Sequence, residues 1–122
     1  MSIPSRLLGS GLSPLAASNI CGDVALALTA TGTTNTDALG LSSVINQVTT
    51  TAASTGVRLM LPESGSAIVV INAGANALLV YPGTGASINA LTATTGGFSI
   101  AAGGRAVFVG TGSANWYAIL SA

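Results

Sequence analysis

The sequence predicts an all-β fold: an antiparallel β-sandwich or jelly-roll-like domain over residues 23–122, preceded by an extended N-terminal arm over residues 1–22. Apolar residues alternate with small or polar ones along most of the domain, which is the period of half-buried strands. Gly-rich and Pro-containing turns separate these stretches at intervals of about 8–12 residues, as in sandwiches and barrels. Residues 1–22 lack such alternation and are therefore treated as a separate segment.

The predicted arm combines apolar residues with residues that break helices and strands. Pro4, Gly9, Gly11 and Pro14 prevent a regular element. The arm is too apolar for a free tail, and an extended chain of this length reaches roughly 70 Å. We expect it to lie on a neighbouring subunit as a strap; an arm folded back on its own domain is the alternative. The residues predicted to contact the partner are Ile3, Arg6, Leu7, Leu8, Leu12 and Leu15.

Five segments show the alternation expected of strands with one buried face. In the first, Val24, Leu26 and Leu28 are expected to share a face, and in the second Val44 and Val48 share a face with Asn46. The predicted strands of this kind are residues 24–28, 44–48, 57–61, 98–101 and 105–109.

Three further segments, residues 67–71, 77–81 and 116–120, are apolar on both faces. Such strands are expected to be buried on both faces. The outer face of a two-layer sandwich is normally solvated, and no predicted helix is available to cover it, so a second copy of the chain is expected to do so. The residues assigned to this subunit interface are Val69, Leu79, Tyr81, Trp116 and Tyr117.

The connections between the strands are predicted from their turn residues. The segment from Asn72 to Asn76 is expected to join residues 67–71 to residues 77–81 as a hairpin. Residues 29–42 are dominated by Thr and Gly, which fits either a long loop or an extra edge strand. No strict internal repeat is visible, so the sequence does not favour a solenoid.

Charge is scarce in this chain. Its 122 residues include three basic and three acidic side chains, with no Lys and no His, and the formal net charge is zero. A folded monomer of this mass exposes roughly 5,900 Å², whereas solution monomers usually carry charges on roughly a quarter to a third of surface positions. The scarcity of charge therefore predicts a component of an assembly, whose surface is covered by neighbours.

The same composition argues against several other functions. General acid–base catalysis most often uses His, and neither the hydroxyls nor Cys21 has a His or Lys to activate it. Three dispersed Arg residues cannot form a sizeable phosphate-binding patch. The longest apolar runs have about five residues, against about 20 for a membrane-spanning helix. We therefore expect no enzyme, cofactor or metal site, and no nucleic-acid or membrane partner. The lone Cys21 is expected to be a free, buried thiol, and an intermolecular disulfide is the alternative.

Several segments together resemble small virion proteins of tailed bacteriophages. They are residues 49–53 and 57–59, the run from Val69 to Asn76 within the pattern V-x-I-N-x-G-x-N-x-L-x-V-Y-P, and residues 116–119. The resemblance covers about the last two-thirds of the chain, and capsid decoration (cement) proteins fit best in size. It implies a structural β protein made in the host cytoplasm and placed on the virion surface, as a homotrimer bound to the major capsid protein.

Two other functions remain open from the sequence. Related β modules occur in phage tail-fibre, baseplate and neck proteins, so a location in the tail is one alternative. A carbohydrate-binding module with Trp116, Tyr117 and Tyr81 as stacking residues is the other.

Overall fold

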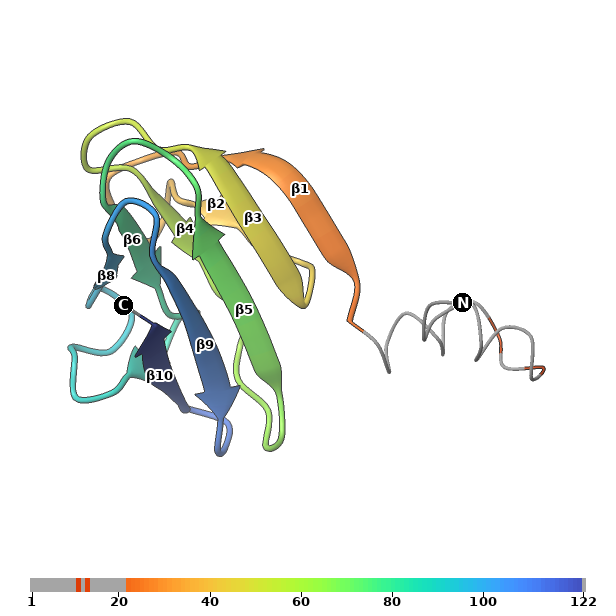
Figure 1. Cartoon of the computed structure of the whole chain (residues 1–122). Helices are drawn as coiled ribbons and strands as arrows, with labels where there is room; N and C mark the ends of the chain where they lie inside the picture. The colour runs from red at the N-terminus through yellow and green to blue at the C-terminus, as the bar shows by residue number, and fades with distance from the viewer. Residues whose placement is uncertain (1–10, 12, 14–21, 122) are drawn as a thin grey trace.

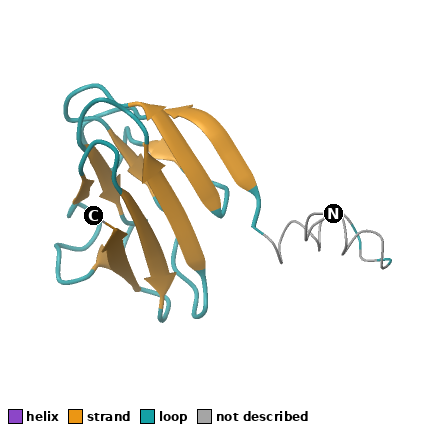
Figure 2. Ribbon diagram, viewed as in Figure 1, coloured by secondary structure: helices purple, strands orange, loops and turns teal. Residues whose placement is uncertain are grey.

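The computed structural model describes residues 11, 13 and 22–121 (Figure 1). The described residues form strands and loops without a helix (Figure 2), so the all-β prediction is confirmed. Cys21 and all the predicted contact residues of the arm, Ile3, Arg6, Leu7, Leu8, Leu12 and Leu15, lie outside this part of the chain. The strands are β1 (Val24–Thr29), β2 (Leu39–Gly40), β3 (Ile45–Thr50), β4 (Gly56–Arg58), β5 (Ala67–Asn72), β6 (Leu78–Tyr81), β7 (Ser87–Ile88), β8 (Phe98–Ile100), β9 (Arg105–Gly110) and β10 (Asn115–Ser121).

The strands form two sheets that share one core. The six-stranded sheet, here called sheet A, has the order β1-β3-β5-β9-β10-β7, and the four-stranded sheet B has the order β2-β4-β6-β8 (Figure 1). Fully buried side chains from both sheets form a single apolar cluster, with Val70 and Phe108 from sheet A and Val57 and Val80 from sheet B. The inward faces of the two sheets therefore pack against each other.

Both sheets are mixed, which corrects the antiparallel expectation. Antiparallel pairing joins β5, β9 and β10 in sheet A, and β6 and β8 in sheet B. By contrast, β1, β3 and β5 pair in parallel, and so do β2, β4 and β6. The first six strands alternate between the sheets, so each sheet receives every second strand in the same direction. This half of the domain therefore winds as short coils, in the manner of a β-solenoid.

No repeat is visible in the sequence of these coils because their lengths differ. In sheet A the paired positions run from Val24 to Ile45 to Val69, and in sheet B from Leu39 to Val57 to Val80. The spacing changes from one coil to the next, and a fixed sequence period requires equal spacing. A strict repeat is thus absent, as the sequence indicates, and the parallel winding of these strands is a feature that only the pairing shows.

The segment from Asn72 to Asn76 is not the predicted hairpin. Its flanking strands, β5 and β6, belong to different sheets, so the segment crosses from one sheet to the other. The fully buried Asn72 side chain fixes this crossing: its amide group donates to the carbonyls of Asn76 and Ile100, both at 2.9 Å, and its Oδ1 accepts from the Gly74 N–H at 3.0 Å. The turn residues correctly indicate that the strand ends here. They do not indicate whether the next strand pairs with β5 or joins the other sheet, because that depends on how the strands pack.

Alternation is also interrupted within β1. The pairing of β1 with β3 is irregular between Ala25 and Leu28, and Ala27 has a positive φ of 56°. Leu28 packs against the core while Leu26 is 66% exposed, so the expectation that these two residues share one face was wrong. A bulge inserts one residue and reverses the facing of the side chains beyond it.

Candidate interaction surface

The outer face of sheet A carries a continuous apolar row across five strands. The backbone pairing connects Val24 to Ile45, Ile45 to Val69, Val69 to Val107 and Val107 to Ile119. Paired residues of neighbouring strands project to the same side of a sheet. This side is the one opposite the core, because the next residues along the central strands, Val70 and Phe108, point inward and are fully buried.

The apolar row lies open to the surroundings in the described structure. Ile119 is 64% exposed, Val24 is 54% exposed, and the central valines are half-buried. A shallow hollow of about 270 Å³ lies on this side of β5, β9 and β10, with Val69, Val107 and Ile119 in its lining. A second short row of Ala67, Val109 and Tyr117 runs beside the first. Large exposed apolar areas of this kind mark interaction surfaces more often than solvated ones.

Polar side chains on this face flank the apolar rows on both sides. On the side beyond Tyr117, Ser87 is paired with Asn115 and donates to its Oδ1 at 2.9 Å. The pairing places Gln47, Ile71 and Arg105 in a row adjacent to the apolar one. Arg105 is the single charged residue among the strand residues that face outward from the described sheet A. We call the two apolar rows, with the half-buried Ile71, the sheet A outer face.

The outer face of sheet B is partly covered by the chain itself, around Tyr81 and Arg58. Tyr81 points away from the core, yet it is only 5% exposed, and its hydroxyl donates to the Thr33 carbonyl at 3.0 Å. On the same face, Nη1 of Arg58 donates to the Asn35 carbonyl at 2.8 Å. Residues 31–38, here called the cover loop, therefore lie over this sheet.

Two glycines make room for the ring of Tyr81 under the cover loop. A Cβ at Gly56 would come within 2.7 Å of the ring, and one at Gly97 within 3.1 Å. The ring packs on bare backbone at Gly56 in β4 and at Gly97 just before β8, which compensates for the missing side chains there.

The cover loop is held in its turn by Asp37. Its Oδ1 accepts hydrogen bonds from the Thr34 N–H at 2.8 Å, the Thr34 hydroxyl at 2.8 Å and the Thr33 N–H at 3.1 Å. The Thr34 backbone N–H is the main cause that lowers the pKa of Asp37, and the Thr34 hydroxyl adds to it. In the same way, the Val44 N–H, 3.0 Å from Oδ1, is the main cause that lowers the pKa of Asp23 at the start of β1.

We predict that the cover loop loosens in acid. A carboxyl group whose pKa is lowered by folding stabilises the folded state fully above its unfolded value, and this contribution is lost as the pH falls through the lower folded value. The NMR shift of the Thr34 amide proton should therefore titrate with a midpoint below 3.8, the ordinary pKa of the Asp37 carboxyl. In Asp37→Ala, the Thr33 and Thr34 amides should lose exchange protection already at pH 7. A midpoint at or above 3.8 would contradict this account.

The cover loop changes the interpretation of the segments that are apolar on both faces. For β6, the chain itself covers Tyr81, so this residue needs no second copy to bury it, whereas Leu79 is half-buried. For β5, β9 and the C-terminal part of β10, no described residue covers the outer face. The requirement for a neighbour thus applies to sheet A.

The five residues assigned to the subunit interface separate into three groups. Val69 and Tyr117 lie on the sheet A outer face, where Tyr117 is 50% exposed. Leu79 and Tyr81 lie on the outer side of sheet B, half-buried and buried. Trp116 is 1% exposed and belongs to the core, with its Nε1 donating to the Met60 carbonyl at 3.1 Å. Tyr81 and Trp116 are therefore satisfied within their own subunit and are removed from the predicted interface.

Sequence reasoning missed several members of the apolar row: Val24, Ile45, Val107 and Ile119. The sequence of residues 105–109 could have indicated this row, because apolar residues there occupy both faces of the predicted strand. The aromatic phase, with Phe108, packs in the core against Phe98 with ring centroids 5.6 Å apart. Val107 and Val109, which alternate with Phe108, therefore face outward. The alternation alone did not show which of the two sets faces the core.

Neither a metal site nor a membrane-spanning helix is found in the described residues. They contain no group of three or more His, Cys, Asp or Glu side chains placed to hold a metal ion. None of their segments forms a helix long and apolar enough to cross a membrane. No protein-family model, curated protein or solved structure matches this chain.

Proposed function

We propose that this chain is a structural protein of a bacteriophage virion, a capsid decoration (cement) protein that forms a homotrimer and stabilises the head shell. We further propose that its two-sheet domain is a β-sandwich that associates with a second copy through the sheet A outer face. The predicted arm, residues 1–22, then supplies the contact with the major capsid protein.

The observation that carries this proposal is the apolar row on an uncovered sheet. Val24, Ile45, Val69, Val107 and Ile119 occupy positions that are polar in a sheet with a solvated outer face. Burial of 1,000 Å² of apolar surface corresponds to about 25 kcal/mol before the costs of ordering and association. Because Arg105 is the single outward-facing charge of the described sheet, association should depend little on salt.

The burial of aromatic residues argues against the carbohydrate-binding alternative. A sugar-stacking platform needs accessible aromatic faces, but Trp116 and Tyr81 are 1% and 5% exposed. Tyr117 alone remains accessible among the three residues considered. The structural alternative, a tail-fibre, baseplate or neck protein, shares the same apolar association and differs in its place in the particle.

The location in the particle tests the proposed function directly. Electron cryomicroscopy of purified virions should show the β domain on the head shell at threefold or quasi-threefold positions. Density at the tail axis or baseplate would instead support the tail alternative, and absence from virions would contradict both.

Deletion of residues 1–22 is expected to separate folding from shell binding. The truncated protein should retain the strands from β1 onward, as judged by circular dichroism, because residues 30–116 of the described chain form a core of their own. Its occupancy on capsids that lack the full-length protein should fall below detection. Occupancy equal to that of the full-length chain would contradict the role proposed for the arm.

A further inference from the structure

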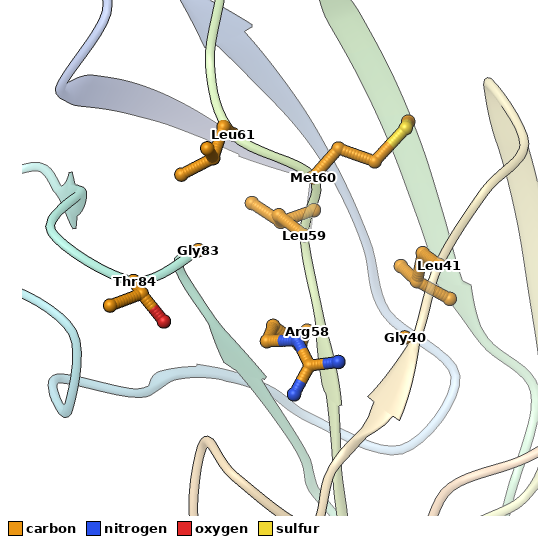
Figure 3. A pocket seen from close by; sticks show the side chains of 8 residues that line it. All are labelled: Gly40, Leu41, Arg58, Leu59, Met60, Leu61, Gly83 and Thr84. Atoms are coloured by element: carbon orange, nitrogen blue, oxygen red, sulfur yellow. The ribbon is translucent and has the colours of Figure 1, made fainter.

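A hollow at the end of sheet B combines a single charge with apolar walls. It has a volume of about 340 Å³, and its walls include Leu41, Leu59, Met60 and Leu61 (Figure 3). Arg58, the last residue of β4, lies within it between Gly40 and Thr84 (Figure 3). A concave, mostly apolar site with few polar groups is the usual form of a small-molecule or peptide-end site. We call it the Arg58 hollow.

The guanidinium of Arg58 has donors to spare. One hydrogen bond, from Nη1 to the Asn35 carbonyl, holds the cover loop, whereas a guanidinium has five N–H groups. No carboxylate among the described residues is paired with it. Asp37 belongs to the same loop, but its Oδ1 is directed to the N–H groups of Thr33 and Thr34. The Arg58 hollow therefore contains a half-buried positive charge without a counter-charge in the described part of the chain.

Two glycines keep the hollow open. A Cβ at Gly40 would lie 3.2 Å from Nη2 of Arg58, and a Cβ at Gly83 would lie 2.8 Å from Cδ2 of Leu61. Neither glycine has a positive φ that would itself require glycine. Their lack of side chains thus leaves space beside the guanidinium and beside the apolar wall.

We propose that the Arg58 hollow binds a carboxylate attached to a short apolar group. The planar guanidinium matches a carboxylate with two parallel hydrogen bonds, and the exposed side chains of Leu61 and Met60 in the lining suit an aliphatic body. A single Arg balances one negative charge, which favours a carboxylate over a phosphate dianion. The carboxylate comes from a free aliphatic acid or from the end of a peptide chain. This site is separate from the sheet A outer face and does not depend on the proposed virion function.

Titration of the full-length protein with 4-methylpentanoate, followed by NMR, tests the proposal. The acid should shift the amide signals of Gly40 and Gly83, and the neutral isostere 4-methylpentanamide should bind at least tenfold more weakly, because charge-assisted hydrogen bonds are lost. Arg58→Gln should reduce the affinity for the acid at least tenfold. Arg105→Gln, which removes the same charge from the other sheet, is the matched control and should leave the affinity unchanged.

Arg58→Gln also removes the hydrogen bond to the cover loop, so a second variant that keeps this bond is needed. Gly40→Ala retains the charge and places a methyl group beside Nη2, so it should weaken acid binding while the Tyr81 signals stay unchanged. Equal binding of acid and amide, equal loss in Arg105→Gln, or no shift with the acid at about 50 mM would each overturn the proposal.

The two carboxylate sources are distinguished by a peptide. If N-acetyl-alanyl-leucine binds at least tenfold more tightly than 4-methylpentanoate, and its amide does not, the hollow receives a chain end. Equal affinity of peptide and acid assigns the site to a free aliphatic acid. Either result is consistent with a carboxylate site. Binding of the peptide amide as tightly as the peptide acid would contradict it.

Discussion

Replacement of Ile119 by Asp is expected to dissociate the oligomer. Ile119 is 64% exposed at one end of the apolar row, so an aspartate there should be tolerated in the isolated subunit. In the proposed interface the carboxylate would lose its water, which costs several kcal/mol per ion, and the diagonal neighbour Arg105 would compensate only part of this cost. We expect association to weaken at least a hundredfold, about 3 kcal/mol. Light scattering at micromolar concentration should report a trimer for the native chain and a monomer for Ile119→Asp.

The matched control is Ala102→Asp, which adds the same charge in the exposed turn between β8 and β9. It should leave the trimer intact. A native chain that is already monomeric at micromolar concentration, or an Ile119→Asp variant that remains trimeric, would contradict the assignment of the sheet A outer face to self-association. Because the arm is unchanged in both variants, this result is independent of the arm deletion.

Replacement of Asn72 by Ala is expected to cause a large loss of stability. The substitution removes the donors to Ile100 and Asn76 and the acceptor of the Gly74 N–H at a fully buried position. A buried backbone group left without a partner costs about 1–3 kcal/mol. The Ile100 carbonyl and the Gly74 N–H lose their Asn72 partner, whereas the Asn76 carbonyl keeps the Thr51 hydroxyl at 3.0 Å. We expect the free energy of unfolding to fall by about 3 kcal/mol and the melting temperature by roughly 10–20 °C. Urea unfolding followed by circular dichroism measures the difference.

Two further variants define the origin of that loss. Asn72→Asp keeps an acceptor for Gly74 but loses both donated hydrogen bonds and buries a charge, so it should be at least as destabilising at neutral pH. Asn115→Ala removes one exposed side-chain hydrogen bond, to Ser87, and should change the free energy of unfolding by less than about 0.5 kcal/mol. If Asn72→Ala is no more destabilising than Asn115→Ala, the side chain does not fix the crossing between the sheets.

The strand content was predictable because alternation and turn chemistry are local. Residues 45–50, 67–72 and 105–110 form strands where a period of two or an apolar run indicates them. The assignment of strands to sheets was not predictable in the same way. Parallel pairing of β1, β3 and β5 joins residues far apart in the sequence, and their unequal spacing hides the coils. The outer faces of sheets A and B differ because the cover loop lies over sheet B. The Thr- and Gly-rich sequence of this loop fits several conformations, so its position was not predictable.

The candidate surface shows the same division. Val69 and Tyr117 were identified from the sequence because their segments are apolar in both phases. Val24, Ile45, Val107 and Ile119 were missed because the sequence does not state which strands are neighbours, and a row across a sheet exists only once register is fixed. Trp116 was misplaced for the opposite reason: its size and apolar context suit a core and an interface equally, and only the Met60 carbonyl and the facing sheet decide between them.

Composition and local periodicity were enough to predict a chain that is all-β, nearly free of charge and rich in strands with two apolar faces. These properties do not depend on which segments come into contact. Which apolar face is covered and which is open became visible only once the strands were paired and packed. The cover loop partly covers sheet B through Tyr81, Arg58 and Asp37, whereas backbone register collects five apolar residues on sheet A. A face of a strand is buried only when another segment packs on it, and here the packing segments are distant in the chain.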